Sequence, residues 1–335
     1  MSHVVLIFGG NGWIGSKVVK LLEDSGENII VIKSRCRADD ATAIQSEICE
    51  IFVKGREVTH IMSFIGRTHG TFEGEVCPTI DYLEKPGKLV ENINDNLFSP
   101  ITLAEIAKRN KMHFTYLGTG CIFDYDDKHL MGNPDGVSGF TESDKPNFFG
   151  SSYSIVKGFT DRLMHQLYDK TALNVRIRMP ITDEISPRNF ITKIINYAKN
   201  AKICSIPNSM TVLNEMLPIM INLALERRVG TLNLTNPGTI SHNEILEMYK
   251  AIVDPSITWQ NFSIEEQNQI LASKRSNNCL DTTYLETHTE LIVNPIKLAV
   301  TNVLIQMFPP FSLEPEGFQS KAGGKDGINL EPKMG

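Results

Sequence analysis

Two side chains suited to proton transfer, Tyr153 and Lys157, lie four residues apart in this 335-residue chain. Residues at this spacing share one face of a helix, so both side chains can point into the same cleft. A Lys ammonium beside a phenol favours the phenolate, so we expect Lys157 to lower the pKa of Tyr153 and make it a proton donor at neutral pH. Thr119, at the end of an expected strand, is placed to bind the oxygen that Tyr153 protonates. The spacing alone is also compatible with a plain amphipathic helix.

A glycine-rich turn at residues 9–15 gives this pair its context. The turn follows a short apolar run, residues 3–8, and leads into a helical pattern of apolar residues. Three glycines at this spacing allow a tight turn, let the backbone approach a pyrophosphate and bring a helix close to a strand. The helix N-terminus then offers free N–H groups to the phosphates. The turn predicts a dinucleotide site, in which the expected contacts come from Gly9, Asn11, Gly12, Trp13, Ile14 and Gly15.

The residues after the second expected strand, residues 28–32, indicate which dinucleotide is preferred. An NAD-specific site usually has Asp or Glu there, which accepts hydrogen bonds from the ribose 2′-hydroxyl. This chain has Lys-Ser-Arg-Cys-Arg at residues 33–37 instead. Cations and a hydroxyl suit a 2′-phosphate, and no carboxylate in this run repels it. We therefore expect Ser34, Arg35 and Arg37 to bind NADP, as NADPH, the alternative being a solvated basic turn.

The composition limits the classes of protein to which the chain can belong. Its formal net charge is −6 and it has no basic stripe, which argues against a nucleic-acid partner. Six cysteines lack paired spacing, as is usual for reduced thiols in the cytosol. The first residues enter a strand at once, and no apolar run approaches the ~20 residues of a membrane span. We therefore expect a cytoplasmic protein without a signal peptide or a membrane partner.

Strand and helix patterns alternate along the first half of the chain. Further strands are expected at residues 58–64, 113–117 and 173–178, and helices at residues 97–107 and 153–167. This alternation predicts an α/β fold with a Rossmann-type doubly wound parallel sheet. Beyond Pro180, helices with short strands such as residues 231–235 predict a smaller C-terminal α/β substrate-binding lobe. The expected division is an NADP-binding domain at residues 1–180, the lobe at residues 181–307 and a disordered tail at residues 308–335.

These motifs together resemble the extended short-chain dehydrogenases that act on sugar nucleotides. The resemblance rests on the glycine turn, on Thr119 and on Tyr153-x-x-x-Lys157. More specific segments are similar to the bifunctional 3,5-epimerase/4-reductases of nucleotide-linked 4-keto-6-deoxy-glucose, which complete rhamnose nucleotide synthesis. These segments are residues 119–123, 178–180, 187–193, 206–211, 236–244 and 275–278. The similarity runs from about residue 3 to about residue 307, and the segment 69–79 departs from it by its greater length.

The resemblance implies an NADPH-dependent enzyme that inverts C3 and C5 of the sugar and then reduces C4. It assigns the epimerisation acid and base to Cys121 and Lys193. A ketone at C4 acidifies the hydrogens on C3 and C5, so groups on opposite faces can invert both centres through enolates. Tyr153 and Thr119 would stabilise those enolates and then protonate the alkoxide. Without the resemblance, Cys121 would be interpreted as a small core residue and Lys193 as a solvated helix charge.

Further candidates depend on the same resemblance. Additional cofactor contacts are expected from Phe64, Ile65, Gly66 and Asn96, beside Tyr153 and Lys157. Substrate contacts are expected from Thr68, Thr119, Cys121, Arg188, Asn189, Asn208, Thr211 and Arg275. Arg275 is the first candidate for the diphosphate. His242 more simply belongs to a helix start, where Ser241 and Glu244 form a capping box. We expect no metal site.

Three other functions stay open at this point. Two are enzymes: a single-function 4-keto sugar-nucleotide reductase and a GDP-fucose-type synthase. The third belongs to another class, a non-catalytic NADP-binding regulatory subunit like that of methionine adenosyltransferase. The intact set of Thr119, Tyr153 and Lys157 argues against the third, although a fold alone does not fix a function. The sequence does not distinguish a UDP from a dTDP substrate, and the resemblance favours a homodimer.

Overall fold

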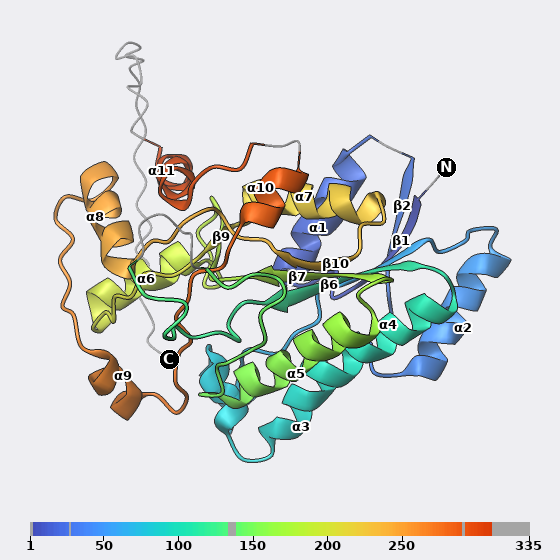
Figure 1. The fold of residues 1–335 in the computed structure, drawn as a ribbon, viewed down its shortest axis with the longest axis horizontal. Coiled ribbons are helices and arrows are strands. Elements are labelled where there is room, and N and C mark those ends of the chain that lie inside the picture. Colours follow the sequence, from blue (N-terminus) through green and yellow to red (C-terminus); the bar gives the residue numbers. More distant parts are fainter. Residues whose placement is uncertain (1–2, 27, 133–138, 290–291, 310–335) are drawn as a thin grey trace, which may run out of the picture.

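A six-stranded parallel sheet forms the centre of the protein (Figure 1). The computed structural model describes residues 3–26, 28–132, 139–289 and 292–309. The strand order is β10-β7-β6-β3-β1-β2, and every neighbouring pair is parallel. The strands are β1 (His3–Phe8), β2 (Ile29–Lys33), β3 (His60–Ser63), β6 (His113–Thr119), β7 (Ala172–Ile177) and β10 (Gly230–Asn233). The predicted Rossmann-type fold is confirmed.

Helices cover both faces of this sheet, and the side chains of β1 alternate between them. Leu6 and Phe8 belong to one apolar core, whereas Val5 and Ile7 belong to the other. The first core contains residues of α2 (Ala41–Val53), α4 (Ser99–Arg109) and α5 (Ser152–Leu167). The second contains residues of α1 (Trp13–Asp24) and α7 (Leu213–Leu225). Burial on both faces explains why this strand is a continuous apolar run.

A third apolar core holds the C-terminal lobe together, at the left of Figure 1. Its helices and strands are β8 (Pro180–Ile181), α6 (Phe190–Asn200), β9 (Thr211–Val212), α8 (His242–Ile252), α9 (Ile264–Ile270) and α11 (Ile296–Met307). Strands β8 and β9 pair in parallel. The predicted capping box at Ser241 and Glu244 begins α8. Phe308, assigned to the tail, packs edge-on against Tyr249, and residues 310–335 of the expected tail lie outside the described residues.

The boundary at residue 180 needs one correction. Residues 213–233, expected in the lobe, return to the central sheet as α7 and β10. Thr231 and Leu232 pair with Asn174 and Val175 of β7, which makes β10 the edge strand of the sheet. The local pattern of four or five residues predicts a strand there but does not say which sheet it joins, because that pairing is a contact between distant segments.

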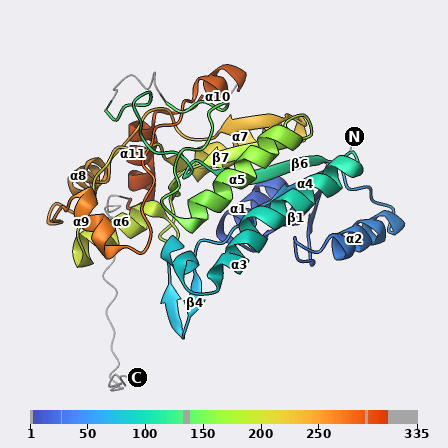
Figure 2. The same ribbon diagram turned by 60° about the horizontal axis from the view of Figure 1, so that its bottom comes forward.

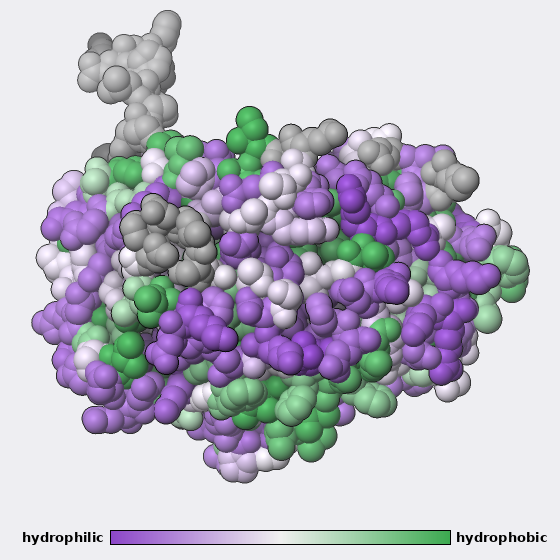
Figure 3. Space-filling view, viewed as in Figure 1, coloured by the Kyte–Doolittle hydropathy of each residue, from purple (hydrophilic) through white to green (hydrophobic). Residues whose placement is uncertain are grey.

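Among the elements that were not predicted, two lack a sequence signal for different reasons. Helix α3 (Lys88–Ile93) lacks a buried apolar stripe: Leu89 and Val90 are 52% and 63% exposed. Figure 3 shows apolar side chains gathered at the lower edge of the molecule, where Figure 1 places α3. The long segment at residues 69–79 forms a hairpin of β4 (Gly70–Phe72) and β5 (Glu75–Cys77), which projects at the lower edge in Figure 2. Three-residue strands are too short to give a periodic signal.

No helix in the described ranges combines the length and the apolar character needed to cross a bilayer. All six cysteines lie within those ranges and are free thiols.

Three histidines form a row at the edge of the sheet where the strands begin. The ring centroids of His3 and His60 are 5.1 Å apart, and those of His60 and His113 are 5.6 Å apart. The pKa of His60 is lowered to about 3, mainly by burial and further by the charges of His113, His3 and Arg227 nearby. The fold therefore keeps His60 neutral at pH values where the unfolded chain binds a proton.

We expect this row to make the protein sensitive to acid. Because the folded pKa of His60 lies below its unfolded value, its contribution to stability is complete above about pH 6.5 and is lost as the pH falls towards 3. The loss amounts to about 2–3 kcal/mol at about pH 4.5. Urea denaturation at several pH values measures the unfolding free energy, and His60→Leu should flatten its pH dependence. Burial also lowers the pKa of His242 to about 4, so some slope should remain.

The control for this prediction is His288→Leu, on the exposed end of α10 (Thr283–His288), which should keep the wild-type slope. Equal slopes for His60→Leu and the wild type would contradict the assignment.

Candidate functional site

The glycine turn links β1 to α1 with very close backbone packing. Gly9 has a positive φ of 77°, and a Cβ there would lie 2.9 Å from the backbone of Phe64. A Cβ on Gly15 would lie 2.2 Å from the carbonyl oxygen of Gly9. The N–H of Gly12 closes the turn by donating to Gly9 (2.9 Å), and no side chain caps α1. The first N–H groups of α1 therefore stay open to a phosphate, and the turn fits a dinucleotide.

The other predicted loop residues differ in exposure. Asn11 is exposed, whereas Trp13 and Ile14 are half-buried and pack on the core beside α7. The ammonium of Lys17 lies 5.9 Å from the Trp13 ring centroid. Trp13 and Ile14 thus have a packing role in addition to any contact with a cofactor.

The end of β2 contains a feature that the sequence did not reveal. Ser34 and Arg35 both bind the buried carboxylate of Glu47, a residue of α2. The guanidinium of Arg35 also donates to Glu50 (2.9 Å), and that of Arg37 pairs with Asp39 (2.7 Å). The run at residues 33–37 has no carboxylate of its own, but α2 folds back over the turn and brings those of Glu47 and Glu50 to it.

The loop after β3 meets Lys157 and Asn96. The Asn96 amide donates to the carbonyl of Arg67 (2.9 Å) and accepts from its N–H (3.0 Å), which fixes the loop. A Cβ on Gly66 would lie 3.4 Å from Asn96 Oδ1 and 3.7 Å from Lys157 Nζ. Asn96 lies in a π-helical turn, η2 (Asn94–Phe98), a distortion that is frequent at functional sites. The structure brings the predicted Gly66, Asn96 and Lys157 together.

The predicted catalytic residues of β6 and α5 also meet. The Thr119 hydroxyl lies close to Tyr153, where hydrogen bonding from Thr119 acts to lower the pKa of the phenol. Thr119 Oγ1 also accepts from the N–H of Cys121 (3.0 Å), and Cys121 packs in one apolar cluster with Tyr153 and Tyr82. The Ser154 hydroxyl donates to the carbonyl of Cys121 (2.7 Å), which ties this loop to α5.

The electrostatics of Tyr153 differ from the expectation. Burial raises the pKa of Tyr153 above its ordinary value, and the nearby Cys121 raises it further. Hydrogen bonding from Thr119 acts in the opposite direction but is the smaller effect. Lys157 does not lower it: burial lowers the pKa of Lys157 itself to about 7, and its Nζ donates to the hydroxyl of Tyr116 (2.7 Å). Tyr153 is therefore held in its protonated form, which is the form that an acid needs.

A group of cationic side chains forms another part of the site. Arg188 Nη1 lies 2.7 Å from Nδ1 of His69, the residue that precedes β4. Burial lowers the pKa of His69, and the positive charges of Arg188, Arg67 and Lys193 lower it further. Burial also lowers the pKa of Lys193, and the charge of Arg188 adds to this effect. Within the described part of the chain, the Lys193 ammonium makes no hydrogen bond. Thr68 is half-buried and lies within 3.1 Å of the same His69 nitrogen.

The hairpin connects this group to the Tyr153 cluster. Gly70 packs so closely on the ring of Tyr82 that a Cβ would lie 2.4 Å from it. Tyr82 packs in turn with Tyr153, and Phe72 and Cys77 of the hairpin line the same cluster. His69 and Arg188 therefore border the Tyr153 cluster. Sequence reasoning missed His69 and Tyr82, because neither belongs to a recognised motif.

Three predicted substrate contacts have internal roles instead. Asn189, Asn208 and Thr211 have no exposed surface. Asn189 caps α6 and donates to the carbonyls of Thr182 and Glu184 (both 2.7 Å). The structure thus gives these residues no surface for a substrate, because similarity of a segment does not reveal which of its side chains are buried.

Asn208 and Thr211 instead hold the buried Arg178. The Asn208 side-chain oxygen accepts from Arg178 Nη2 (2.7 Å), and Thr211 Oγ1 accepts from its backbone N–H (3.0 Å).

Arg275 is not a free cation. It donates to both carboxylate oxygens of Asp81 in η1 (Ile80–Glu84) and to Ser273. Burial raises the pKa of Asp81, but hydrogen bonds from Arg275 and Thr79 outweigh it and lower the pKa to about 2. The pair connects η1 to the segment before α10.

Comparison with known proteins agrees with this geometry. Residues 5–216 match the model of the NAD dependent epimerase/dehydratase family. An uncharacterised protein of Acanthamoeba polyphaga mimivirus is 54% identical over 282 residues, 84% of this chain and 91% of that protein. A bifunctional dTDP-4-dehydrorhamnose 3,5-epimerase/reductase of Arabidopsis thaliana is 41% identical over 287 residues, 85% of this chain and 87% of that protein.

A solved structure is also similar. The crystal structure of a UDP-rhamnose synthase from Acanthamoeba polyphaga mimivirus superposes with a TM-score of 0.82 at 51% identity, over 92% of this chain and 100% of that one. The family model covers more than half of the chain. As the motifs predicted, the chain belongs to the NAD dependent epimerase/dehydratase family.

Proposed function

We propose that the protein is an NADPH-dependent enzyme with two activities on a nucleotide-linked 4-keto-6-deoxy-glucose. It inverts C3 and C5 and then reduces C4, which yields the L-rhamnose nucleotide. The observation that supports this most directly is the contact of Thr119 with Tyr153 in a cluster that also contains Cys121. The relatives named as a UDP-rhamnose synthase and as an epimerase/reductase support the same reaction pair.

The epimerisation needs groups that remove and return protons. The C4 ketone makes the hydrogens on C3 and C5 acidic, and Cys121 and Lys193 serve as the acid and base. The lowered pKa of Lys193 leaves more of its amine neutral, so that it can accept a proton. Thr119 and Tyr153 donate hydrogen bonds to the oxygen on C4, where the enolate charge develops.

The reduction uses the same oxygen contacts. A bound nicotinamide dinucleotide supplies the hydride. Tyr153 gives its proton to the oxygen on C4, and Thr119 holds that oxygen in place. Lys157 and Asn96 hold the ribose side of the cofactor beside Gly66, and the glycine turn binds its phosphates.

We also propose that NADPH is preferred over NADH. Arg35 and Arg37 are exposed cations at the end of β2, and the side chain of Lys33 lies over Gly10, where a Cβ would be 3.0 Å from its Cγ. A 2′-phosphate placed beside these cations gains charge-assisted hydrogen bonds, whereas a 2′-hydroxyl does not. Of the two arginines predicted to contact substrate, Arg188 is the one proposed for the diphosphate, since Arg275 pairs with Asp81.

The test is incubation of the purified protein with UDP- or dTDP-4-keto-6-deoxy-glucose and either NADPH or NADH. Proton NMR of the sugar should show the rhamnose configuration, formed faster with NADPH. Reduction without inversion would point to a single-function reductase, and cofactor binding without turnover to a regulatory subunit. Equal turnover with both cofactors would contradict the NADPH preference. The homodimer stays a prediction, which sedimentation equilibrium tests directly.

A further inference from the structure

The cation expected to recognise the 2′-phosphate is already paired within the protein. Arg35 Nη2 donates to Glu50 Oε2 at 2.9 Å, and Arg35 Nε lies 3.4 Å from Glu47 Oε1. The Ser34 hydroxyl donates to Glu47 at 2.6 Å, and the backbone N–H of Arg35 donates to the same carboxylate at 3.0 Å. Both side-chain types that suit a phosphate are therefore held by carboxylates of α2.

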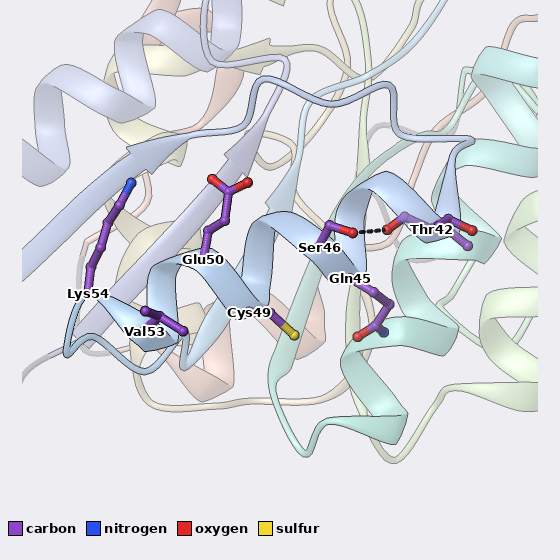
Figure 4. A pocket seen from close by; sticks show the side chains of 8 residues that line it. Thr42, Gln45, Ser46, Cys49, Glu50, Val53 and Lys54 are labelled. Carbon is purple, nitrogen blue, oxygen red and sulfur yellow. Dashed lines mark hydrogen bonds between the residues drawn. The ribbon is translucent and has the colours of Figure 1, made fainter.

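The position of these carboxylates is fixed by the packing of α2. Ile44, Ile48 and Ile51 are buried in the core against the sheet, which sets the rotation of the helix. Glu47 and Glu50 are three residues apart and so face the same side. Figure 4 shows Glu50 leaving the helix on the side of the neighbouring strands, whereas Cys49 points the other way. Glu47 is 4% exposed, while the Glu50 side chain is 55% exposed.

We propose that Glu50 determines how strongly the protein distinguishes NADPH from NADH, by competing with the 2′-phosphate for Arg35. This inference rests on the proposed use of NADPH. A phosphate that binds Arg35 must displace the Glu50 carboxylate and then lies close to its negative charge. NADH has only a hydroxyl at that position, so it neither needs Arg35 nor is repelled. Glu47 acts as a positioning residue, because it holds the backbone of the turn at Arg35.

The experiment measures the dissociation constants of NADPH and NADH by nicotinamide fluorescence, without substrate. Glu50→Gln should tighten NADPH binding by about two- to fivefold, the range expected for one exposed ion pair, and leave NADH unchanged. The gain should shrink at high salt, because the charges are exposed. The matched control is Glu105→Gln, which breaks the exposed Arg109–Glu105 pair on α4 and should change neither constant.

Arg35→Ala separates this inference from the proposed cofactor preference. If Arg35 binds the phosphate, its loss weakens NADPH by roughly tenfold or more and NADH much less. Adding Glu50→Gln to the Arg35→Ala variant should then leave the dissociation constant of NADPH unchanged. A selective effect of Arg35→Ala, with an unchanged NADPH/NADH ratio in Glu50→Gln, overturns the role of Glu50 and leaves the cofactor preference standing. Equal weakening of both cofactors by Arg35→Ala overturns both.

Discussion

Replacing Tyr153 with phenylalanine should lower the rate of C4 reduction by about 10²–10⁴-fold, the range that general acid catalysis contributes. The ring stays in its cluster with Tyr82 and Cys121, so the fold should be preserved. Only the hydroxyl that bonds to Thr119 and carries the proton is lost. NADPH oxidation in the presence of the ketosugar nucleotide measures the rate, and the dissociation constant of NADPH should stay nearly the same.

The chain provides a matched control in the same cluster. The hydroxyl of Tyr82 donates to Glu91 (2.7 Å) rather than to Thr119, so Tyr82→Phe removes a hydroxyl at the same depth without removing the acid. Its reduction rate should fall far less. Near-normal NADPH oxidation by Tyr153→Phe would exclude Tyr153 as the acid and favour the interpretation as a regulatory subunit.

The parts of the site that could be predicted from sequence are those whose local pattern fixes their geometry. The glycine turn needs Gly9 and Gly15 because their Cβ positions are filled by backbone, a requirement visible in the spacing alone. Tyr153 and Lys157 share one face of α5 because a helix places residues at this interval together. The parallel sheet follows from the alternation of strands and helices.

The parts that could not be predicted depend on contacts between distant segments. Glu47 reaches Ser34 and Arg35 because α2 packs against the sheet, and no local pattern shows that contact. The prediction that Lys157 lowers the pKa of Tyr153 was wrong for the same kind of reason. The Lys157 ammonium is directed to Tyr116 on β6, and burial controls the titration of both groups. Desolvation depends on the surrounding core, which spacing within one helix does not report.

The acid and base for epimerisation should separate from the reduction when they are mutated. Cys121→Ala should abolish most of the deuterium uptake from heavy water at C3 and C5, because the group that exchanges a proton with these carbons is lost. A loss of about 10²-fold or more is expected for each acid–base group. Proton NMR of the ketosugar, run without NADPH, measures the exchange at each carbon directly. Because Tyr153 and Thr119 are unchanged, this variant should still bind NADPH and reduce the unepimerised sugar slowly to a 6-deoxy-glucose product.

Lys193→Ala tests the second group, and two controls separate chemistry from packing. Cys77→Ala removes a thiol from the same apolar cluster, and Lys199→Ala removes an exposed charge from the last turn of α6. Both controls should exchange at nearly the wild-type rate. Lys193 is half-buried beside Arg188, and that burial lowers its pKa, so its variant should also flatten the pH dependence of exchange. Full exchange at both carbons in the Cys121→Ala, Lys193→Ala double variant would refute the assignment, because neither group would then be needed to move a proton at C3 or C5.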